Sequence, residues 1–197
     1  MTASDQSEHP PVGSEKPELR KWWRAKLAQS GPTPEESARV CQQVLATLEY
    51  QQAEWVGIFA ARGHEVDLRL LWEARPNHVC FPRTYPEEML LRFFPVADWK
   101  DLLLGYRGIL EPLDIVPQVE PKLVLVPGIT FDREGGRLGS GLGYYDRYLA
   151  QVPGAIKWGV VLDRHISPNP IAQQQTDVRM DALCTESGIV PCRRSSE

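Results

Sequence analysis

The residues best suited to chemistry lie in a glycine-rich segment, residues 135–146, that ends in an aspartate. Glycines lack Cβ atoms and tolerate positive φ, so successive backbone N–H groups can converge on a phosphate. If a helix begins at Gly143 or Tyr144, its unpaired N–H groups and the positive end of its dipole add to that site. Arg137 offers a planar guanidinium to phosphate oxygens, and Asp146 offers magnesium a hard oxygen ligand. The segment therefore predicts an anion site with a metal ligand beside it.

The same glycines also fit a loop that uses them only for turning. The spacing matches neither the G-x-x-x-x-G-K-[ST] pattern of a P-loop nor a clean dinucleotide-binding fingerprint. The residues by themselves leave both interpretations open.

Length and charge set the broad class of protein. A chain of 197 residues fits one domain with a sizeable core, and a net charge of -4 argues against a nucleic acid as the main partner. No apolar stretch approaches the length of a membrane span, and the first fifteen residues lack the apolar core of a signal peptide. We expect a cytoplasmic protein with one domain over residues 15–197, after a disordered polar tail over residues 1–14.

The cysteines are scattered without C-x-x-C spacing or an accompanying histidine cluster. This pattern predicts inert thiols and indicates neither a zinc site nor a disulfide framework. The cysteines are Cys41, Cys80, Cys184 and Cys192.

Helical and strand-like patterns alternate along the chain. Thr33 and Glu36 have the spacing of a capping box, with a proline at the first helical position, and Asp67 can cap a later helix. Pro82 is expected to end a short buried strand. The alternation predicts a three-layer αβα fold around a mostly parallel or mixed sheet. Helices are expected over residues 17–30, from 33, from 67 and over 144–151, and strands over 55–60, 79–81, 90–96, 123–126 and 158–162.

A longer pattern around the glycine segment resembles the signature of the 5-formyltetrahydrofolate cyclo-ligase family. It runs from Val126-Pro127-Gly128 to Asp132, then through Gly136 to Gly139, Gly141 and Gly143 to Arg147, and ends at Leu149. Outlying motifs follow in the same order: Lys16 with Leu19-Arg20, Ile58-Phe59 with Glu65-Val66-Asp67, Phe81-Pro82-Arg83, Gly108-Ile109 with Glu111-Pro112, Asp177-Val178 with Met180-Asp181, and Thr185-Glu186. The resemblance covers residues 16–190 and implies a scaffold like that of sugar-phosphate isomerases and CoA transferases.

Members of this family use ATP and magnesium to convert 5-formyltetrahydrofolate into 5,10-methenyltetrahydrofolate, with release of ADP and phosphate. The resemblance implies phosphoryl activation of the formyl oxygen, a step that needs positioned cations and a metal. It assigns this catalytic role to Lys16, Arg20 and Arg137. The expected partners are 5-formyltetrahydrofolate and ATP, with Mg²⁺ as cofactor, no nucleic acid and no membrane, and the protein is expected to be a monomer.

The resemblance also carries over binding residues. It places magnesium on Asp146 and Asp177. For ATP it implies Lys16, Pro17, Glu18, Leu19, Arg20, Arg137, Leu138, Gly139, Ser140, Gly141, Leu142, Gly143, Tyr144 and Tyr145. For the folate it implies Ala60, Glu65, Ser140, Gly141, Leu142, Gly143 and Tyr144.

Several of these residues have simpler interpretations without the resemblance. Lys16 and Arg20 then fit a solvated helix face, and Glu65 fits an ordinary helix-start carboxylate. Next to Asp177 the chain departs from the family pattern, and we hypothesise that Arg179 there pairs with phosphate.

Two other functions are compatible with the same residues. One is a folate- or nucleotide-binding regulator without turnover, although binding alone would not require both carboxylates together with Arg137. The other is a sugar-phosphate isomerase or transferase on a related scaffold, because fold does not determine function. It would leave Lys16 and Arg20 without a role.

Overall fold

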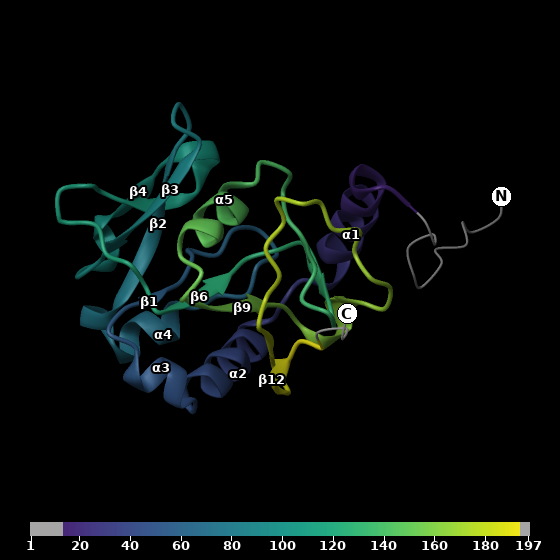
Figure 1. The fold of residues 1–197 in the computed structure, drawn as a ribbon. Helices are drawn as coiled ribbons and strands as arrows, with labels where there is room; N and C mark the ends of the chain where they lie inside the picture. The colour runs from purple at the N-terminus through teal and green to yellow at the C-terminus, as the bar shows by residue number, and fades with distance from the viewer. Residues whose placement is uncertain (1–13, 194–197) are drawn as a thin grey trace.

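The computed structural model describes residues 14–193 and centres on a seven-stranded sheet (Figure 1). Its strands, from one edge to the other, are β12 (Gly188–Pro191), β11 (Ala182–Thr185), β9 (Ile156–Val160), β6 (Leu123–Val126), β1 (Val56–Gly57), β2 (Val79–Tyr85) and β3 (Leu90–Pro95). The strands from β11 to β2 run parallel, and β12 and β3 are antiparallel edges. The predicted α/β class with a mostly parallel sheet is confirmed.

Helices cover both faces of this sheet (Figure 1). Leu123 and Leu125 of β6 pack into the core cluster on the side of α2, and Val124 and Val126 pack into the cluster on the side of α5. Both faces of the strand are therefore buried, as parallel sheets require. The helices are α1 (Lys16–Ser30), α2 (Pro34–Leu45), α3 (Leu48–Gln52), α4 (Arg69–Ala74) and α5 (Tyr144–Gln151).

Smaller elements complete the described chain. A three-stranded sheet has the order β10 (Ile166–Ser167), β7 (Thr130–Asp132) and β8 (Arg137–Leu138), and a two-stranded one joins β4 (Leu102–Leu104) to β5 (Leu110–Pro112). Short 3₁₀ helices are η1 (Pro76–His78), η2 (Trp99–Asp101), η3 (Tyr106–Gly108) and η4 (Asp163–His165).

The order of the strands reverses between β1 and β6. From β1 the chain builds β2 and β3 toward one edge, and from β6 it builds β9 and β11 toward the other. In open α/β sheets such a reversal leaves a crevice at the carboxyl ends of the strands, where ligands bind. Here that crevice lies between the segments that follow Gly57 and Val126.

The start of α2 matches the predicted capping box. The Thr33 hydroxyl accepts a hydrogen bond from the Glu36 N–H at 3.2 Å, and the Glu36 carboxylate accepts one from the Thr33 N–H at 2.9 Å. Asp67 differs slightly from expectation, because Leu68 is the capping residue of α4 and the Asp67 carboxylate accepts from the Arg69 N–H at 2.9 Å.

The predicted end of a strand at Pro82 is wrong. Strand β2 continues to Tyr85, and Pro82 pairs opposite Phe93 of β3. Within β2, strand β1 pairs with Val79 and Cys80 alone, so β1 has ended before Pro82. Because no strand of the described chain pairs with Pro82 on the β1 side, the missing proline N–H removes no hydrogen bond there.

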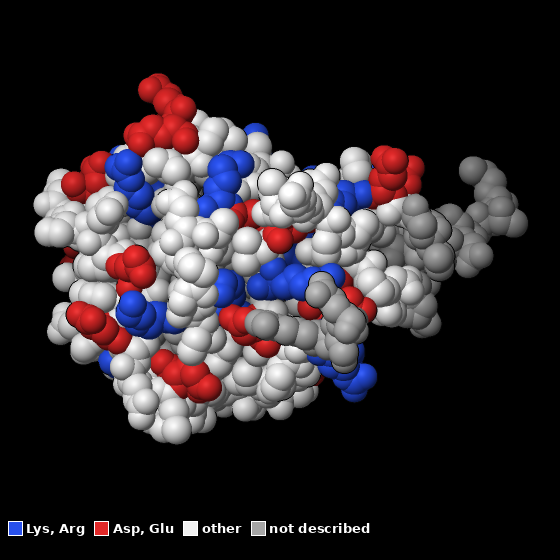
Figure 2. Space-filling view, viewed as in Figure 1, with Lys and Arg blue, Asp and Glu red and all other residues white. Residues whose placement is uncertain are grey.

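Residues 1–13 of the predicted tail lie outside the described residues. All four cysteines are free thiols, as expected. Among the described residues no helix is both long and apolar enough to cross a membrane. Acidic and basic side chains are interspersed over the face shown in Figure 2.

We predict that Thr33→Ala lowers the free energy of unfolding by about 1 kcal/mol, because α2 loses the acceptor of its first turn. Urea denaturation of the purified variant measures this loss. Thr33→Ser keeps a hydroxyl and serves as the control. Equal losses in the two variants would contradict a capping role.

Candidate active site

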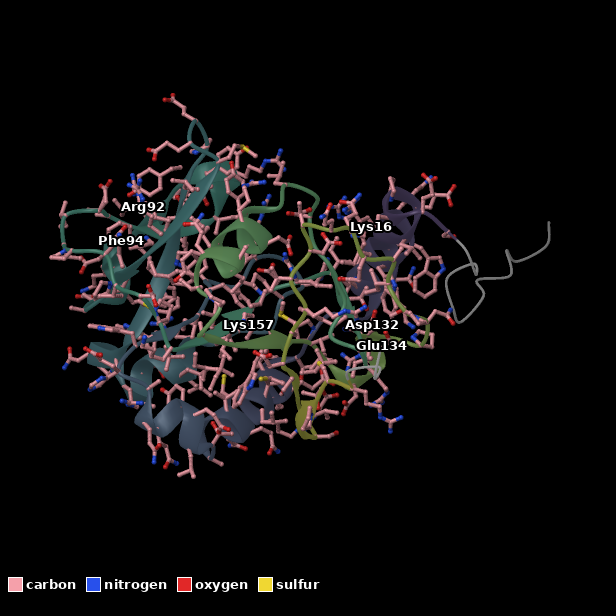
Figure 3. The ribbon with its side chains drawn as sticks, viewed as in Figure 1. Lys16, Arg92, Phe94, Asp132, Glu134 and Lys157 are labelled. Atoms are coloured by element: carbon pink, nitrogen blue, oxygen red, sulfur yellow. The ribbon has the colours of Figure 1, made fainter. Side chains whose placement is uncertain are left out.

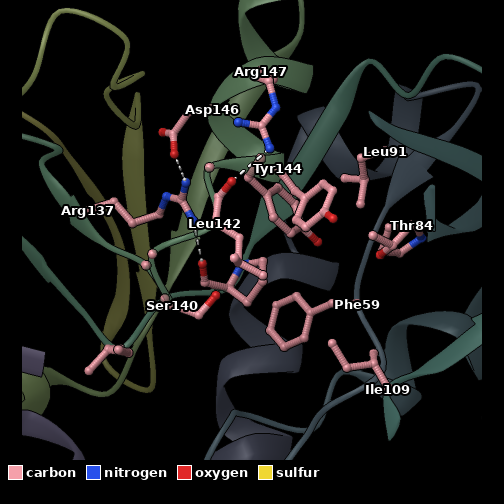
Figure 4. Close-up of a pocket in the computed structure, with 18 of the residues that line it drawn as sticks. Phe59, Thr84, Leu91, Ile109, Arg137, Ser140, Leu142, Tyr144, Asp146 and Arg147 are labelled. Carbon is pink, nitrogen blue, oxygen red and sulfur yellow. Dashed lines mark hydrogen bonds and ion pairs between the residues drawn. The ribbon is translucent and has the colours of Figure 1, made fainter. Parts of the chain in front are cut away.

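A cavity of about 1180 Å³ opens in the crevice between β1 and β6. One side carries Arg137, Asp146 and the glycine segment, and the other carries apolar and aromatic side chains such as Phe59 and Ile109 (Figure 4). The cavity therefore has a charged half and an aromatic half.

The glycine segment runs from β8 into α5 along the charged half. Gly141 and Gly143 have φ values of 104° and 69°, where side chains are strained, and α5 begins at Tyr144 with Gly143 as its capping residue. A Cβ at Gly139 would lie 3.0 Å from Nη1 of Arg137, so a side chain there would require the guanidinium to shift. The predicted helix start is confirmed.

A buried ion pair joins Arg137 to Asp146. The Arg137 Nη2 donates to Asp146 Oδ2 at 2.7 Å, with 8% and 16% of the two side chains exposed. Nη1 of the arginine donates to the Pro127 carbonyl at 3.3 Å, and its guanidinium lies 5.6 Å from the centroid of the Tyr145 ring. The other Asp146 oxygen accepts from the Val178 N–H at 3.3 Å. This pair connects β8, α5 and the loop that carries Asp177.

A second ion pair holds Lys16 against Asp177 at 2.5 Å, and each side chain is 16% exposed. Partial burial raises the pKa of Asp177, but hydrogen bonds from the Gln174 N–H and from Lys16 outweigh this and leave the pKa below its ordinary value. Arg20, one turn after Lys16 on the same face of α1, donates to the Gly139 carbonyl at 2.9 Å. The structure thus brings Lys16 and Arg20 of α1 to the charged half of the cavity, and Arg20 contacts the glycine segment itself.

Asp132 fixes the β7–β8 hairpin that precedes the glycine segment (Figure 3). Its carboxylate is 2% exposed and accepts from the N–H groups of Glu134 at 2.9 Å, Gly136 at 2.8 Å and Ile171 at 2.6 Å. Ile171 belongs to the loop that leads to Asp177. The buried carboxylate therefore ties the hairpin of Arg137 to that loop.

Three of the predicted ATP residues do not line the cavity. Glu18 points to solvent, and Leu19 packs against a small core cluster that contains Leu138. Leu138 follows Arg137 in a strand, so the two side chains point to opposite faces. The other predicted residues do line the cavity, namely Lys16, Pro17, Arg20, Ala60, Glu65, Arg137, Gly139, Ser140, Gly141, Leu142, Gly143, Tyr144, Tyr145, Asp146 and Asp177.

Arg179 lies outside the cavity, contrary to the hypothesis that it pairs with phosphate. Its Nη1 donates to the Glu134 carbonyl at 3.0 Å and lies 3.5 Å from the Glu134 carboxylate. Arg179 therefore does not belong to the charged half of the cavity.

Glu65 and Tyr145 add further polar groups to the lining of the cavity. The Glu65 carboxylate accepts from the Arg62 N–H at 2.8 Å. Burial raises the pKa of Glu65 to about 6, although that hydrogen bond and the Arg62 charge lower it. The Tyr145 hydroxyl is buried and has no hydrogen-bond partner among the described residues. Burial and the Glu65 charge raise the pKa of Tyr145, so its hydroxyl stays a neutral donor.

Residues 105–111 form a wall of the aromatic half that the sequence analysis did not assign. Glu111 is 4% exposed, and its carboxylate accepts from the N–H groups of Thr84 at 3.3 Å and Tyr106 at 3.4 Å. A Cβ at Gly105 would lie 2.2 Å from this carboxylate, so only glycine fits. The Gly108-Ile109 and Glu111-Pro112 motifs signalled this wall, but nothing in their spacing indicated a role.

The candidate metal ligands fit magnesium by their chemistry. Among residues 14–193 no group of three or more His, Cys, Asp or Glu side chains is arranged to hold a metal ion. Magnesium commonly takes one or two carboxylates together with substrate phosphates. Asp146 and Asp177 provide such a pair of oxygen donors on the charged half.

Residues 12–186 match the model of the 5-formyltetrahydrofolate cyclo-ligase family. The chain belongs to this family. It resembles the Aquifex aeolicus 5,10-methenyltetrahydrofolate synthetase with a TM-score of 0.76 and 29% identity, over 92% of this chain and 95% of that one. The expectation that this cyclo-ligase family member shares the scaffold of sugar-phosphate isomerases stays a prediction.

Curated relatives in the same family match parts of the chain. The mitochondrial 5-formyltetrahydrofolate cyclo-ligase of Arabidopsis thaliana is 34% identical over 122 residues, which are 51% of this chain and 44% of that protein. The 5-formyltetrahydrofolate cyclo-ligase of Haemophilus influenzae is 29% identical over 118 residues, 56% of this chain and 63% of that protein. The matched part thus spans less than two thirds of either relative.

We predict that Glu65 makes stability depend on pH. Because its folded-state pKa of about 6 lies above the ordinary 4.5, Glu65 favours folding most below pH 4.5, and this contribution is lost as pH rises through about 6. Glu65→Gln removes the dependence. Between pH 4.5 and about 7.5, wild type should lose on the order of 1 kcal/mol relative to the variant, after allowance for solvent screening. Chemical denaturation at both pH values measures the difference, and a constant difference would refute it.

Proposed function

We propose that this protein is a 5-formyltetrahydrofolate cyclo-ligase, which uses ATP and Mg²⁺ to form 5,10-methenyltetrahydrofolate, ADP and phosphate. The main support is one cavity whose charged half gathers Lys16, Arg20 and Arg137 with two carboxylates, and whose other half is aromatic. A polyphosphate and a flat heterocycle fit these halves, and membership of the family supports the same assignment.

The reaction needs activation because a formamide carbonyl is a poor electrophile. The formyl oxygen attacks the γ-phosphorus, so an O–P bond forms while the bond from that phosphorus to the bridging oxygen breaks and ADP leaves. The folate nitrogen N10 then attacks the formyl carbon and loses its proton. Phosphate departs with the former formyl oxygen, and the five-membered ring is closed.

The protein's part in the first step is to position and neutralise the phosphates. Arg137 and Lys16 supply positive charge, and the N–H groups at the start of α5 add hydrogen-bond donors. Asp146 and Asp177 would hold magnesium, which neutralises the phosphate oxygens when bound. Arg20 braces the segment through the Gly139 carbonyl.

In the aromatic half, Glu65 is proposed to accept hydrogen bonds from the amino and ring N–H donors of the pterin. Ala60, also after β1, leaves room for the ring, and Tyr144 faces the cavity beside it. The neutral Tyr145 hydroxyl is available as a donor to a substrate oxygen.

We further propose that residues 15–197 form one domain that acts as a monomer in the cytoplasm. The family match, which spans residues 12–186, supports a single unit. The Arabidopsis thaliana relative is mitochondrial, so imaging of a fluorescent fusion at native expression is the test of compartment.

The function is tested by mixing purified protein with 5-formyltetrahydrofolate, Mg²⁺ and ATP and following the absorbance of the methenyl product. We expect product only when ATP and the metal are both present, because the formyl oxygen must be phosphorylated first. Protein with ATP and 5-formyltetrahydrofolate in excess EDTA is the control. Absence of ATP-dependent product would refute the proposed activity.

We predict that Asp177→Asn binds ATP without metal more tightly than wild type does. Asp177 is ion-paired with Lys16, so removing the charge of Asp177 frees Lys16 to bind phosphate. The expected gain is about 1 kcal/mol, or roughly fivefold in Kd. The expected gain disappears in the Lys16→Met background. Isothermal titration calorimetry in EDTA measures both affinities.

The control is Glu134→Gln, which also removes one negative charge from an ion pair but lies outside the cavity. If Asp177→Asn raises the affinity for ATP equally with and without Lys16, the gain comes from the loss of charge repulsion between Asp177 and the phosphates. The prediction that Lys16 is freed would then be wrong.

A further inference from the structure

Two arginines stack on an aromatic pair in the aromatic half of the cavity. The rings of Tyr106 and Tyr144 meet edge to face, with centroids 6.0 Å apart. The Arg107 guanidinium lies 5.5 Å from the centroid of Tyr106, and that of Arg147 lies 5.2 Å from the centroid of Tyr144. All four residues line the cavity, and we call them the cationic rim.

Among the described residues the cations of the rim have no carboxylate partner, unlike Lys16 and Arg137 of the charged half. Arg107 and Arg147 take part in none of the ion pairs within residues 14–193, whereas Arg137 and Lys16 are each paired with an aspartate. Guanidinium groups stacked on rings present their N–H edges outward. The rim therefore offers unneutralised positive charge to a ligand.

Two backbone carbonyls hold the Arg147 side chain, and Arg107 lies on an anchored bend. Arg147 donates from Nε to the Met89 carbonyl at 2.8 Å and from Nη2 to the Leu142 carbonyl at 2.7 Å, so its third nitrogen stays available (Figure 4). Arg107 lies in a tight bend with a φ of 56°, and Glu111 anchors that bend through the Tyr106 N–H.

Both positive charges act on the same phenol. Partial burial and Tyr106 raise the pKa of Tyr144, and the charges of Arg147 and Arg107 oppose that rise. Arg107 and Arg147 therefore form one electrostatic patch although they are 40 residues apart in the chain (147 − 107).

We propose that Arg107 and Arg147 bind the glutamate carboxylates of the folate substrate and select glutamylated folates. This inference rests on the proposed function. A folate continues from its pterin into a flat benzoyl ring and then into a glutamate with two carboxylates. The tyrosine pair fits the benzoyl ring, and the guanidinium groups fit the carboxylates.

The test compares the affinity of the protein for 5-formyltetrahydrofolate with that for 5-formyltetrahydropteroate, which lacks the glutamate. Titration of tryptophan fluorescence without ATP gives both Kd values. Wild type should bind the glutamate form at least about tenfold more tightly, because charge-assisted hydrogen bonds are strong. Arg107→Gln should reduce this ratio roughly fivefold and leave the affinity for the pteroate form unchanged. Arg147→Gln should reduce it similarly.

Arg92→Gln is the matched control. Arg92 stacks on Tyr85 with its guanidinium 4.6 Å from the ring centroid, so the variant loses the same charge and a stacking contact, together with an ion pair to Glu88 at 2.9 Å. It does not line the cavity and lies toward the opposite side of the molecule from Lys16 (Figure 3).

Equal affinity of wild type for the two ligands would overturn the inference, as would an equal change of the ratio in the Arg107 and Arg92 variants. Formation of the methenyl product with either result would leave the proposed function intact. If neither ligand binds, the proposed function and this inference fail together.

Arg107→Gln is decisive if Arg147→Gln does not fold. Within the described residues the Arg107 side chain supports no backbone carbonyl, whereas the Arg147 side chain donates hydrogen bonds to two.

Discussion

The ion pair between Arg137 and Asp146 is the interaction on which the geometry of the site depends. It closes the glycine segment onto the start of α5, and the second Asp146 oxygen holds the loop that carries Asp177. A buried pair adds little net stability, but loss of one partner leaves an uncompensated buried charge. Asp146 and the Pro127 carbonyl hold the guanidinium of Arg137, whose Nε is buried without a partner in the described part of the chain and is an unused donor.

The cavity separates two kinds of positive charge in a chain whose net charge is -4. Lys16 and Arg137 of the charged half are each neutralised by an aspartate. A polyanion that binds Lys16 and Arg137 must displace the aspartates from them. A metal ion can bind the displaced carboxylates. The metal and the phosphates are therefore expected to bind cooperatively. The cations of the rim need no such exchange, because stacking on tyrosine rings supports them without neutralising them.

Local sequence rules predicted those elements whose causes are local. The capping box of Thr33 and the start of α5 after Gly143 depend on neighbouring residues, and both were correct. The rule that proline ends a strand failed at Pro82 because its outcome depends on whether another strand lies alongside. Leu138 was assigned to ATP with Arg137, but alternation along β8 buries it.

The sequence by itself determined which chemical groups are present and the family in which they occur together, because the motif from Gly136 to Arg147 is contiguous. Only the tertiary structure decided which groups meet. The switch of strand order between β1 and β6 brings Glu65 to the cavity, and the packing of β5 beside β2 brings Arg107 opposite Arg147. Such meetings depend on the order of strands in the sheet, and that order is set by burial across the whole core rather than by any local spacing.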